Sequence, residues 1–207
     1  TAIGVSVLRH NSAGHSNTAI GRDAMLSNTT GFNNTSIGSQ SMLFNTTGTQ
    51  NTALGYGALR DNTTGYFNVS IGSISLSSNT TGESNTAIGN GSLNRNSIGS
   101  RNVAVGGHAL FSNEIGIGNT GSGWSVLGEN TTGSENSAYG GSAMEKNKVG
   151  KRNTAMGANS LWNSNANNNT AIGYSAAYGT TTGYSNTALG SYALYSNTNR
   201  SNLVAIG

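Results

Sequence analysis

Three aromatic residues in the last quarter of the chain are the best candidates for contact with a ligand or a partner. Trp162, Tyr178 and Tyr195 follow one another at almost equal intervals along the sequence. Large, rigid rings gathered on one surface bind sugars or partner proteins well. Packing between identical chains is the alternative, because Leu26 and Phe111 are apolar residues at equivalent places in the sequence.

Other residue types that carry chemistry do not gather in a recognisable pattern. Residues 116–121 match the G-x-G-x-x-G motif of dinucleotide-binding loops, but that site requires a helix after the motif and no helical pattern follows. The histidines are His10, His15 and His108, cysteine is absent, and no metal-ligand spacing occurs. We therefore predict no catalytic, cofactor or metal site, and we expect that the protein is not an enzyme.

The candidate rings belong to a repeat that covers the whole sequence. Units of constant length, of which one is a residue shorter than the others, end on the glycines Gly21, Gly38, Gly55, Gly72, Gly89, Gly106, Gly123, Gly140, Gly157, Gly173, Gly190 and Gly207. Short fixed periods are typical of solenoids, in which each unit buries its apolar face against its neighbours. Residues 1–207 are thus one repeat array, and we expect it to be a segment of a longer fibre.

Counting each unit from one to seventeen, positions four and sixteen are mostly Leu, Met or Ile, in short stretches bounded by Asn and Gly. Such alternation predicts strands and turns rather than helices. We expect each unit to be one coil with two short strands, both apolar positions pointing inward, and positive φ at the glycines of positions ten and seventeen. The fold class is an all-β, parallel β-roll or β-solenoid of about twelve 17-residue coils.

Stacked coils would make residues at the same position of successive units direct neighbours. The recurrent asparagines at positions seven and thirteen would then pass amide hydrogen bonds from coil to coil. Two pairs of opposite charge, Glu129 with Lys146 and Glu135 with Arg152, are each separated by one unit and should lie side by side.

One coil departs from the pattern. Ser122 occupies position sixteen and Gly121 occupies position fifteen, where Ala or Ser is usual. A missing apolar side chain in the interior would leave a costly cavity. We expect Tyr139 or Trp124 to fill it.

Composition limits the classes of partner. Charged residues make up 8% of the chain, and the cluster Lys146–Arg152 has acidic neighbours and lacks interleaved aromatic residues, so we expect no nucleic-acid binding. No stretch approaches the length of a membrane span, so we expect no membrane insertion by this segment. A thin coil with a regular Ala and Ser face is expected to associate with copies of itself in a closed ring.

The Asn-Thr-Ala-Ile-Gly repeats, as at residues 17–21, and the Asn-Thr-Thr-Gly repeats resemble the YadA-like head repeats of trimeric autotransporter adhesins. They are equally similar to repeats in the trimeric tail fibres of phages. The resemblance covers the whole chain and implies a left-handed parallel β-roll assembled as a homotrimer. The family spacing N-x-x-A-I-G occurs at residues 202–207, the other copies are mostly one residue shorter, and the repeat unit is longer than the commonest adhesin repeat.

These observations predict the head or shaft of an extracellular trimeric fibre that attaches to a cell surface or matrix, with a host glycan or protein as its partner. The location would be the bacterial cell surface or, alternatively, a virion, where the chain would be a tail-fibre shaft or receptor-binding segment. A lesser alternative is an ice-binding β-solenoid with a Thr column at position fourteen. Val69, Val103 and Ser137 interrupt that column, and Thr is expected to point inward together with Ile.

Overall fold

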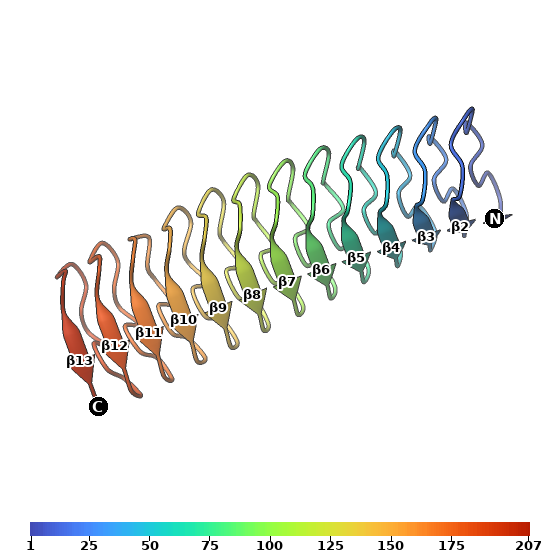
Figure 1. Ribbon diagram of the computed structural model, residues 1–207. Coiled ribbons are helices and arrows are strands. Elements are labelled where there is room, and N and C mark those ends of the chain that lie inside the picture. The colour runs from blue at the N-terminus through green and yellow to red at the C-terminus, as the bar shows by residue number, and fades with distance from the viewer.

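Thirteen short strands form one parallel sheet that runs the length of a rod in the computed structural model, which describes residues 1–207 (Figure 1). Each strand pairs with the next along the chain, and no helix is present. The strands are β1 Ala2–Ile3, β2 Thr18–Ile20, β3 Thr35–Ile37, β4 Thr52–Leu54, β5 Val69–Ile71, β6 Thr86–Ile88, β7 Val103–Val105, β8 Thr120–Ser122, β9 Ser137–Tyr139, β10 Thr154–Met156, β11 Thr170–Ile172, β12 Thr187–Leu189 and β13 Val204–Ile206. The predicted all-β parallel solenoid of about twelve 17-residue coils is confirmed.

The register of the sheet follows the sequence repeat. Thr18 lies opposite Thr35, and this offset of one full unit holds between neighbouring strands except at one pair. Between β10 and β11 the offset is one residue smaller, with Thr154 opposite Thr170, because the coil between these strands is one residue shorter. Residues one unit apart are therefore direct neighbours, as the repeat predicts.

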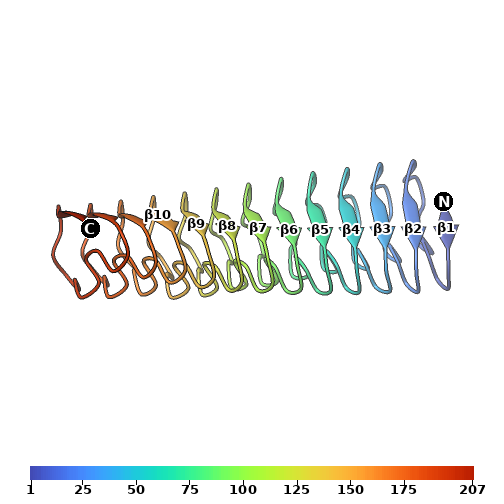
Figure 2. The same cartoon turned by 90° about the horizontal axis from the view of Figure 1, so that it is seen from below.

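The prediction of two strands per coil is wrong, since each coil contains one (Figure 2). In all twelve coils the residues at positions two, four and twelve adopt left-handed backbone conformations, as Asp23 and Met25 do with φ values of 60° and 50°. This alternation curls the apolar Ser-Ala-Leu segment into a turn. The turn still bonds to the next coil, for example through the amide of Met25 and the carbonyl of Ser41 at 3.1 Å. Of 143 backbone hydrogen bonds, 23 join strand residues. The other 120 include bonds from coil to coil outside the strands, such as Ser27 N to Leu43 O at 3.1 Å, so the turns also hold the coils together.

The two recurrent glycines have different roles. At position seventeen φ lies between 114° and 141°, a range that L side chains rarely adopt, so the predicted positive φ is confirmed there. At position ten the prediction is wrong, because φ is not positive. A Cβ on Gly82 would instead collide with the Asn79 side chain and with the carbonyl oxygen of Gly99 in the next coil. Close packing therefore requires this glycine.

The interior of the rod is narrow and consists of three apolar columns. Position four supplies the large side chains, such as Leu59 and Leu93, and positions three and fifteen supply mainly alanine. Position sixteen lies outside this core, which corrects the expectation that it points inward. On β6 the side chain of Ala87 is buried, whereas Thr86 is half-buried and Ile88 is exposed. Successive strand residues face opposite sides, so an inward Ala turns both of its neighbours outward.

Buried asparagines form the two predicted ladders. At position seven, Asn79 Nδ2 donates to Asn62 Oδ1 at 2.8 Å, and Asn96 Nδ2 donates to Asn79 Oδ1 at the same distance. At position thirteen, Asn85 Oδ1 accepts both the backbone amide and the side-chain amide of Asn102 at 3.0 and 3.2 Å. Each buried amide thus has partners in neighbouring coils, which removes the penalty of burying it.

The expected cavity at Ser122 does not exist, because position sixteen is on the surface. The residue of this coil that lacks an inward side chain is Gly121. A Cβ at Gly121 would lie 3.0 Å from Cγ1 of Val126. Val126 stands at position three, which is normally Ala or Ser, so its extra volume replaces the methyl group that Gly121 lacks. Neither Tyr139 nor Trp124, both exposed, fills this space.

Residues at position fifteen of one coil and position three of the next also complement each other elsewhere in the rod. Ser36 at position fifteen shares a hydrogen bond with Ser41 at position three, and Ser70 shares one with Ser75. A buried hydroxyl at position fifteen is therefore accompanied by a hydroxyl partner at position three of the next coil.

Of the two predicted charge pairs, one forms. Lys146 makes an ion pair and hydrogen bond with Glu129 in the preceding coil. Glu135 and Arg152 do not form an ion pair, because Arg152 Nε donates instead to Asn168 Oδ1 at 3.0 Å.

Candidate ligand and partner surfaces

Trp162, Tyr178 and Tyr195 form a stacked column along the rod. The ring centroids of Trp162 and Tyr178 are 5.1 Å apart with an interplanar angle of 4°, and those of Tyr178 and Tyr195 are 5.2 Å apart at 14°. All three stand at position five of consecutive coils, one rung apart. The structure therefore brings together the three residues singled out from the sequence, and we refer to them as the aromatic ladder.

The ladder uses its ring faces internally. Tyr178 lies between the other two rings, and the Lys146 ammonium lies 5.6 Å from the centre of the Trp162 ring. The Trp162 Nε1 group donates to Glu145 Oε2 at 3.3 Å. Stacking on a sugar requires a free ring face. Neighbouring rings cover both faces of Tyr178, and Lys146 and Tyr178 lie on the ring of Trp162, whereas Tyr195 is 42% exposed and lines the hollow of the last coil. The geometry favours packing of the ladder over ligand binding.

A second aromatic group, not predicted as a site, lies nearer the middle of the rod. His108 stacks against Phe111 at 5.1 Å and against Trp124 at 5.3 Å, with interplanar angles of 19°. The guanidinium of Arg95 lies 5.3 Å from the Phe111 ring centre. Trp124 is 63% exposed, the largest value among the Trp, Tyr and Phe side chains. The sequence signal that could have found this group is the glycine at position one of the coils on both sides of Trp124.

Beside this group is a notch of about 170 Å³. His108, Ser112 and Ser125 line it together with the carboxylates of Glu129 and Glu145. The hydrogen bond that Lys146 donates to Glu129 raises the pKa of Lys146, so the Lys146 ammonium stays protonated at neutral pH. The notch therefore offers hydroxyl and carboxylate oxygens next to an aromatic surface.

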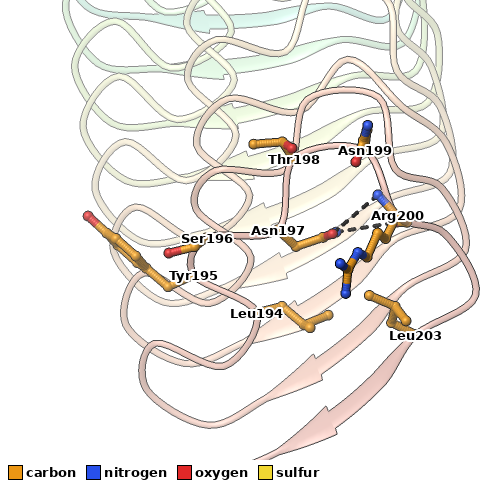
Figure 3. Close-up of a pocket in the computed structure, with 8 residues that line it drawn as sticks. All are labelled: Leu194, Tyr195, Ser196, Asn197, Thr198, Asn199, Arg200 and Leu203. Carbon is orange, nitrogen blue, oxygen red and sulfur yellow. Dashed lines mark hydrogen bonds between the residues drawn. The ribbon is translucent and has the colours of Figure 1, made fainter.

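A larger hollow of about 540 Å³ lies on the face of the last coil (Figure 3). Asn197 and Arg200 exchange hydrogen bonds across it at 3.1 and 3.2 Å. In every preceding coil the corresponding face is covered by the next coil, so this hollow is the end of the stack and carries no site-specific chemistry.

The outward side of the sheet is the third candidate surface. We define the outer strand face as the side chains at positions fourteen and sixteen. Neither column contains a charged residue. Position sixteen is half-buried or exposed throughout and consists of Ile20, Ile37, Leu54, Ile71, Ile88, Val105, Ser122, Tyr139, Met156, Ile172, Leu189 and Ile206.

Threonine at position fourteen shares this face, as Thr86 does beside Ile88 on β6. The expectation that Thr points inward together with Ile is therefore wrong. Both are outward because Ala, between them, faces the core. The interruptions of the Thr column at Val69, Val103 and Ser137 remain.

The remaining motifs have structural roles. In the G-x-G-x-x-G segment, Gly116 accepts hydrogen bonds from Asn102 and Asn113, and the segment leads into β8 without a helix. His10 and His15 are exposed, and no group of three or more His, Asp or Glu side chains could hold a metal ion. The structure contains no helix with the length and apolar character needed to span a membrane.

Comparison with protein-family models, with curated protein sequences and with solved structures found no match to this chain.

Proposed function

We propose that this chain is a structural and adhesive segment of an extracellular homotrimeric fibre that mediates attachment to a cell surface or to matrix. The head repeats of trimeric autotransporter adhesins, and the shaft or receptor-binding segments of phage tail fibres, are the two settings that its repeats resemble. A left-handed coil and a threefold assembly come with that resemblance. The bacterial cell surface and the virion tail are the corresponding locations.

The outer strand face is the observation that carries this proposal. Twelve coils at about 4.8 Å make this face about 58 Å long. It is uncharged throughout, and Leu54 and Met156 on it are each 44% exposed in a single chain. Monomeric proteins rarely leave so long an apolar surface in water.

A second copy of the same chain is the partner that this face suits best. Every coil presents the same two columns at the same spacing, so an identical chain can align rung by rung along the whole length. Closed rings of identical subunits leave no such face uncovered, and a threefold ring gives a stiff fibre with three equal outer surfaces. Repeated weak contacts on these surfaces would add up through avidity.

Native mass and sedimentation of the purified chain test the assembly. We expect a trimer, and we expect Ile88→Glu combined with Val105→Glu to give monomers, because carboxylates would be buried without partners. Thr81→Glu introduces the same type of charge at an exposed position away from the outer strand face and should leave the trimer intact. A monomeric parent chain would contradict the proposal.

Binding of the trimer to cultured cells and to extracellular matrix tests attachment. An adhesive segment binds by itself, whereas a spacer does not. The triple variant with alanine at Trp162, Tyr178 and Tyr195 asks whether the aromatic ladder takes part. Since stacking covers most ring faces of the ladder, we expect this variant to lose stability rather than attachment.

Ice binding is a second candidate, because the Thr column points outward. Thr18 and Ile20 lie on the same flat outer strand face, and the columns continue at rung spacing along the rod. Thermal hysteresis by a monomeric parent chain, abolished by Thr86→Lys, would favour this function over the trimeric fibre. A trimer without thermal hysteresis would exclude it, since the face would then be covered.

A further inference from the structure

We propose that Tyr174 and Tyr192 form an oxidative cross-linking site, at which the two phenol rings are joined as dityrosine. Their ring centroids are 5.4 Å apart with an interplanar angle of 80°. Tyr174 is 49% exposed and Tyr192 is 55% exposed, so an oxidant in solution can reach both phenols. The product is a covalent bond between the last two coils, and it does not depend on the proposed attachment function.

The backbone holds these two residues side by side. Tyr174 is at position one of its coil, Tyr192 is at position two of the next, and the amide of Tyr192 donates to the carbonyl oxygen of Tyr174 at 2.9 Å. The same bond joins the amide of Ile74 to the carbonyl oxygen of Tyr56 at 2.8 Å. Position two of each coil thus lies against position one of the coil before it, and Tyr174 with Tyr192 is the pair in which both residues are tyrosine.

The orientation of the two rings suits the coupling reaction. Dityrosine forms between ring-edge carbons next to the phenol oxygens, so it requires contact through a ring edge. Tyr174 and Tyr192 make such a contact, whereas Tyr178 and Tyr195 lie face to face at 14°, and their edges do not meet. Tyr192 also contacts Tyr195 edge to face, but stacking on Tyr178 holds Tyr195 in the aromatic ladder.

The phenol of Tyr192 reacts in its neutral form. Desolvation, and then the neighbouring phenol of Tyr174, raises the pKa of Tyr192, so its hydroxyl is protonated at neutral pH. Oxidation therefore removes one electron and one proton from each phenol. The resulting phenoxyl radicals carry unpaired electron density on the carbons next to the oxygen.

Combination of the two radicals forms one C–C bond between these carbons. The hydrogen on each coupled carbon then moves to the phenol oxygen of its own ring, which restores both aromatic rings and both hydroxyls. Hydrogen peroxide, acting through a haem peroxidase, accepts the two electrons and two protons and is reduced to two water molecules. The net change in the chain is the loss of two hydrogen atoms.

The cross-link joins coils that share no side-chain hydrogen bond at position seven. The hydroxyl of Thr180 has no partner, and the side chain of Asn197 bonds only to Arg200 in its own coil. A bond between Tyr174 and Tyr192 closes a short loop, which lowers the conformational entropy of the unfolded chain. We therefore expect slower hydrogen exchange in the last coil after cross-linking, because that coil frays less.

Oxidation of the purified chain with a haem peroxidase and hydrogen peroxide tests the site, with dityrosine fluorescence and mass spectrometry of proteolytic fragments as readouts. We expect single chains that have lost two hydrogen atoms, with Tyr174 bonded to Tyr192. Tyr192→Phe should lose nearly all of the fluorescence, because phenylalanine keeps the ring and lacks the phenol. Tyr56→Phe is the matched control and should keep the fluorescence, since Tyr56 is also 55% exposed but lies against Ile74.

Ile74→Tyr in the Tyr192→Phe background places two tyrosines in the same relation elsewhere in the rod and should restore the fluorescence. Ile74 already has a left-handed backbone like that of Tyr192, with φ values of 50° and 62°, so the coil accepts this change. Circular dichroism shows whether each variant is folded. Fluorescence that persists in Tyr192→Phe, a folded Ile74→Tyr variant that restores none, or bonds formed only between separate chains would overturn the site. These outcomes leave the attachment proposal to its own tests.

Discussion

The coils up to Gly157 and the three coils after it hold their rungs together in different ways. In the first region the asparagine ladder at position seven is unbroken from Asn11 to Asn147, with donor–acceptor distances between 2.7 and 3.0 Å. In the second region Ser164 and Thr180 replace asparagine. There the Thr180 hydroxyl is buried without a hydrogen-bond partner.

The aromatic ladder occurs in the region where the asparagine ladder at position seven stops. Trp162, Tyr178 and Tyr195 belong to the three coils after Gly157, and the first of these coils is also the one that is a residue shorter. The ladder at position thirteen continues through Asn169 and Asn186, so only the position-seven ladder ends where the stacked rings begin. The stacking of the coils is retained without the position-seven ladder.

Among substitutions that distinguish the two regions, we expect Gly82→Ala to have the largest effect on the free energy of unfolding. The added methyl group would collide with Asn79 and with the backbone of the next coil, so we expect a loss of about 4 kcal/mol from overpacking and broken hydrogen bonds. Guanidinium unfolding followed by circular dichroism measures it. In the shortened coil Ala166 takes the corresponding place, and Ala166→Gly should change stability by less than about 1 kcal/mol. Equal effects in the two coils would contradict the comparison.

A smaller loss is expected from Asn79→Ala within the asparagine ladder. Asn62 Oδ1 would lose its donor and Asn96 Nδ2 would lose one of its two acceptors, so the free energy of unfolding should fall by about 2–3 kcal/mol. Hydrogen exchange should show the loss of protection spreading to both adjoining coils. Asn197→Ala, at an asparagine that bonds only within its own coil, should cost less than about 1 kcal/mol. Similar losses at both sites would show that the ladder adds nothing.

Removal of the central ring of the aromatic ladder is the corresponding test of the second region. Tyr178→Ala deletes two stacking contacts, and we expect a loss of about 2 kcal/mol in chemical unfolding. Phe44→Ala is the control, because Phe44 is 48% exposed and stacks on no other ring. If the control were as destabilising as Tyr178→Ala, loss of area rather than stacking would explain the effect.

The smallest effect concerns the buried hydroxyl of Thr180. Thr180→Val keeps the shape of the side chain and removes an unpaired polar group. The free energy of unfolding should therefore rise by at most about 1 kcal/mol, which an increase of the unfolding midpoint would show. Thr181→Val is expected to act in the opposite direction, because its hydroxyl donates to the carbonyl of Thr198 at 3.0 Å. A decrease in stability for Thr180→Val would mean that this hydroxyl has a partner in solution.

The repeat by itself determined the parallel stack, the vertical register, the asparagine ladders and the stacking of Trp162, Tyr178 and Tyr195. All of these depend only on which residues are one unit apart, since a chain that repeats in sequence brings equal positions together in space. The Glu129–Lys146 pair followed from the same rule. Glu135 and Arg152 are also one unit apart but form no ion pair, because the Arg152 side chain bonds to Asn168 instead. The rule therefore does not determine the partner of a side chain that has several within reach.

The conformation within one coil was decided only by the tertiary structure. Alternation of apolar residues predicted two strands, but left-handed residues such as Met25 made one of them a turn. Whether Ala or Ile of an Ala-Ile pair faces the core depends on the space inside, and a narrow coil has room for alanine there. This choice turned Thr and Ile outward and created the outer strand face. The stacking of Trp124 on His108 likewise depends on how far the indole lies over Gly107, which spacing alone does not specify.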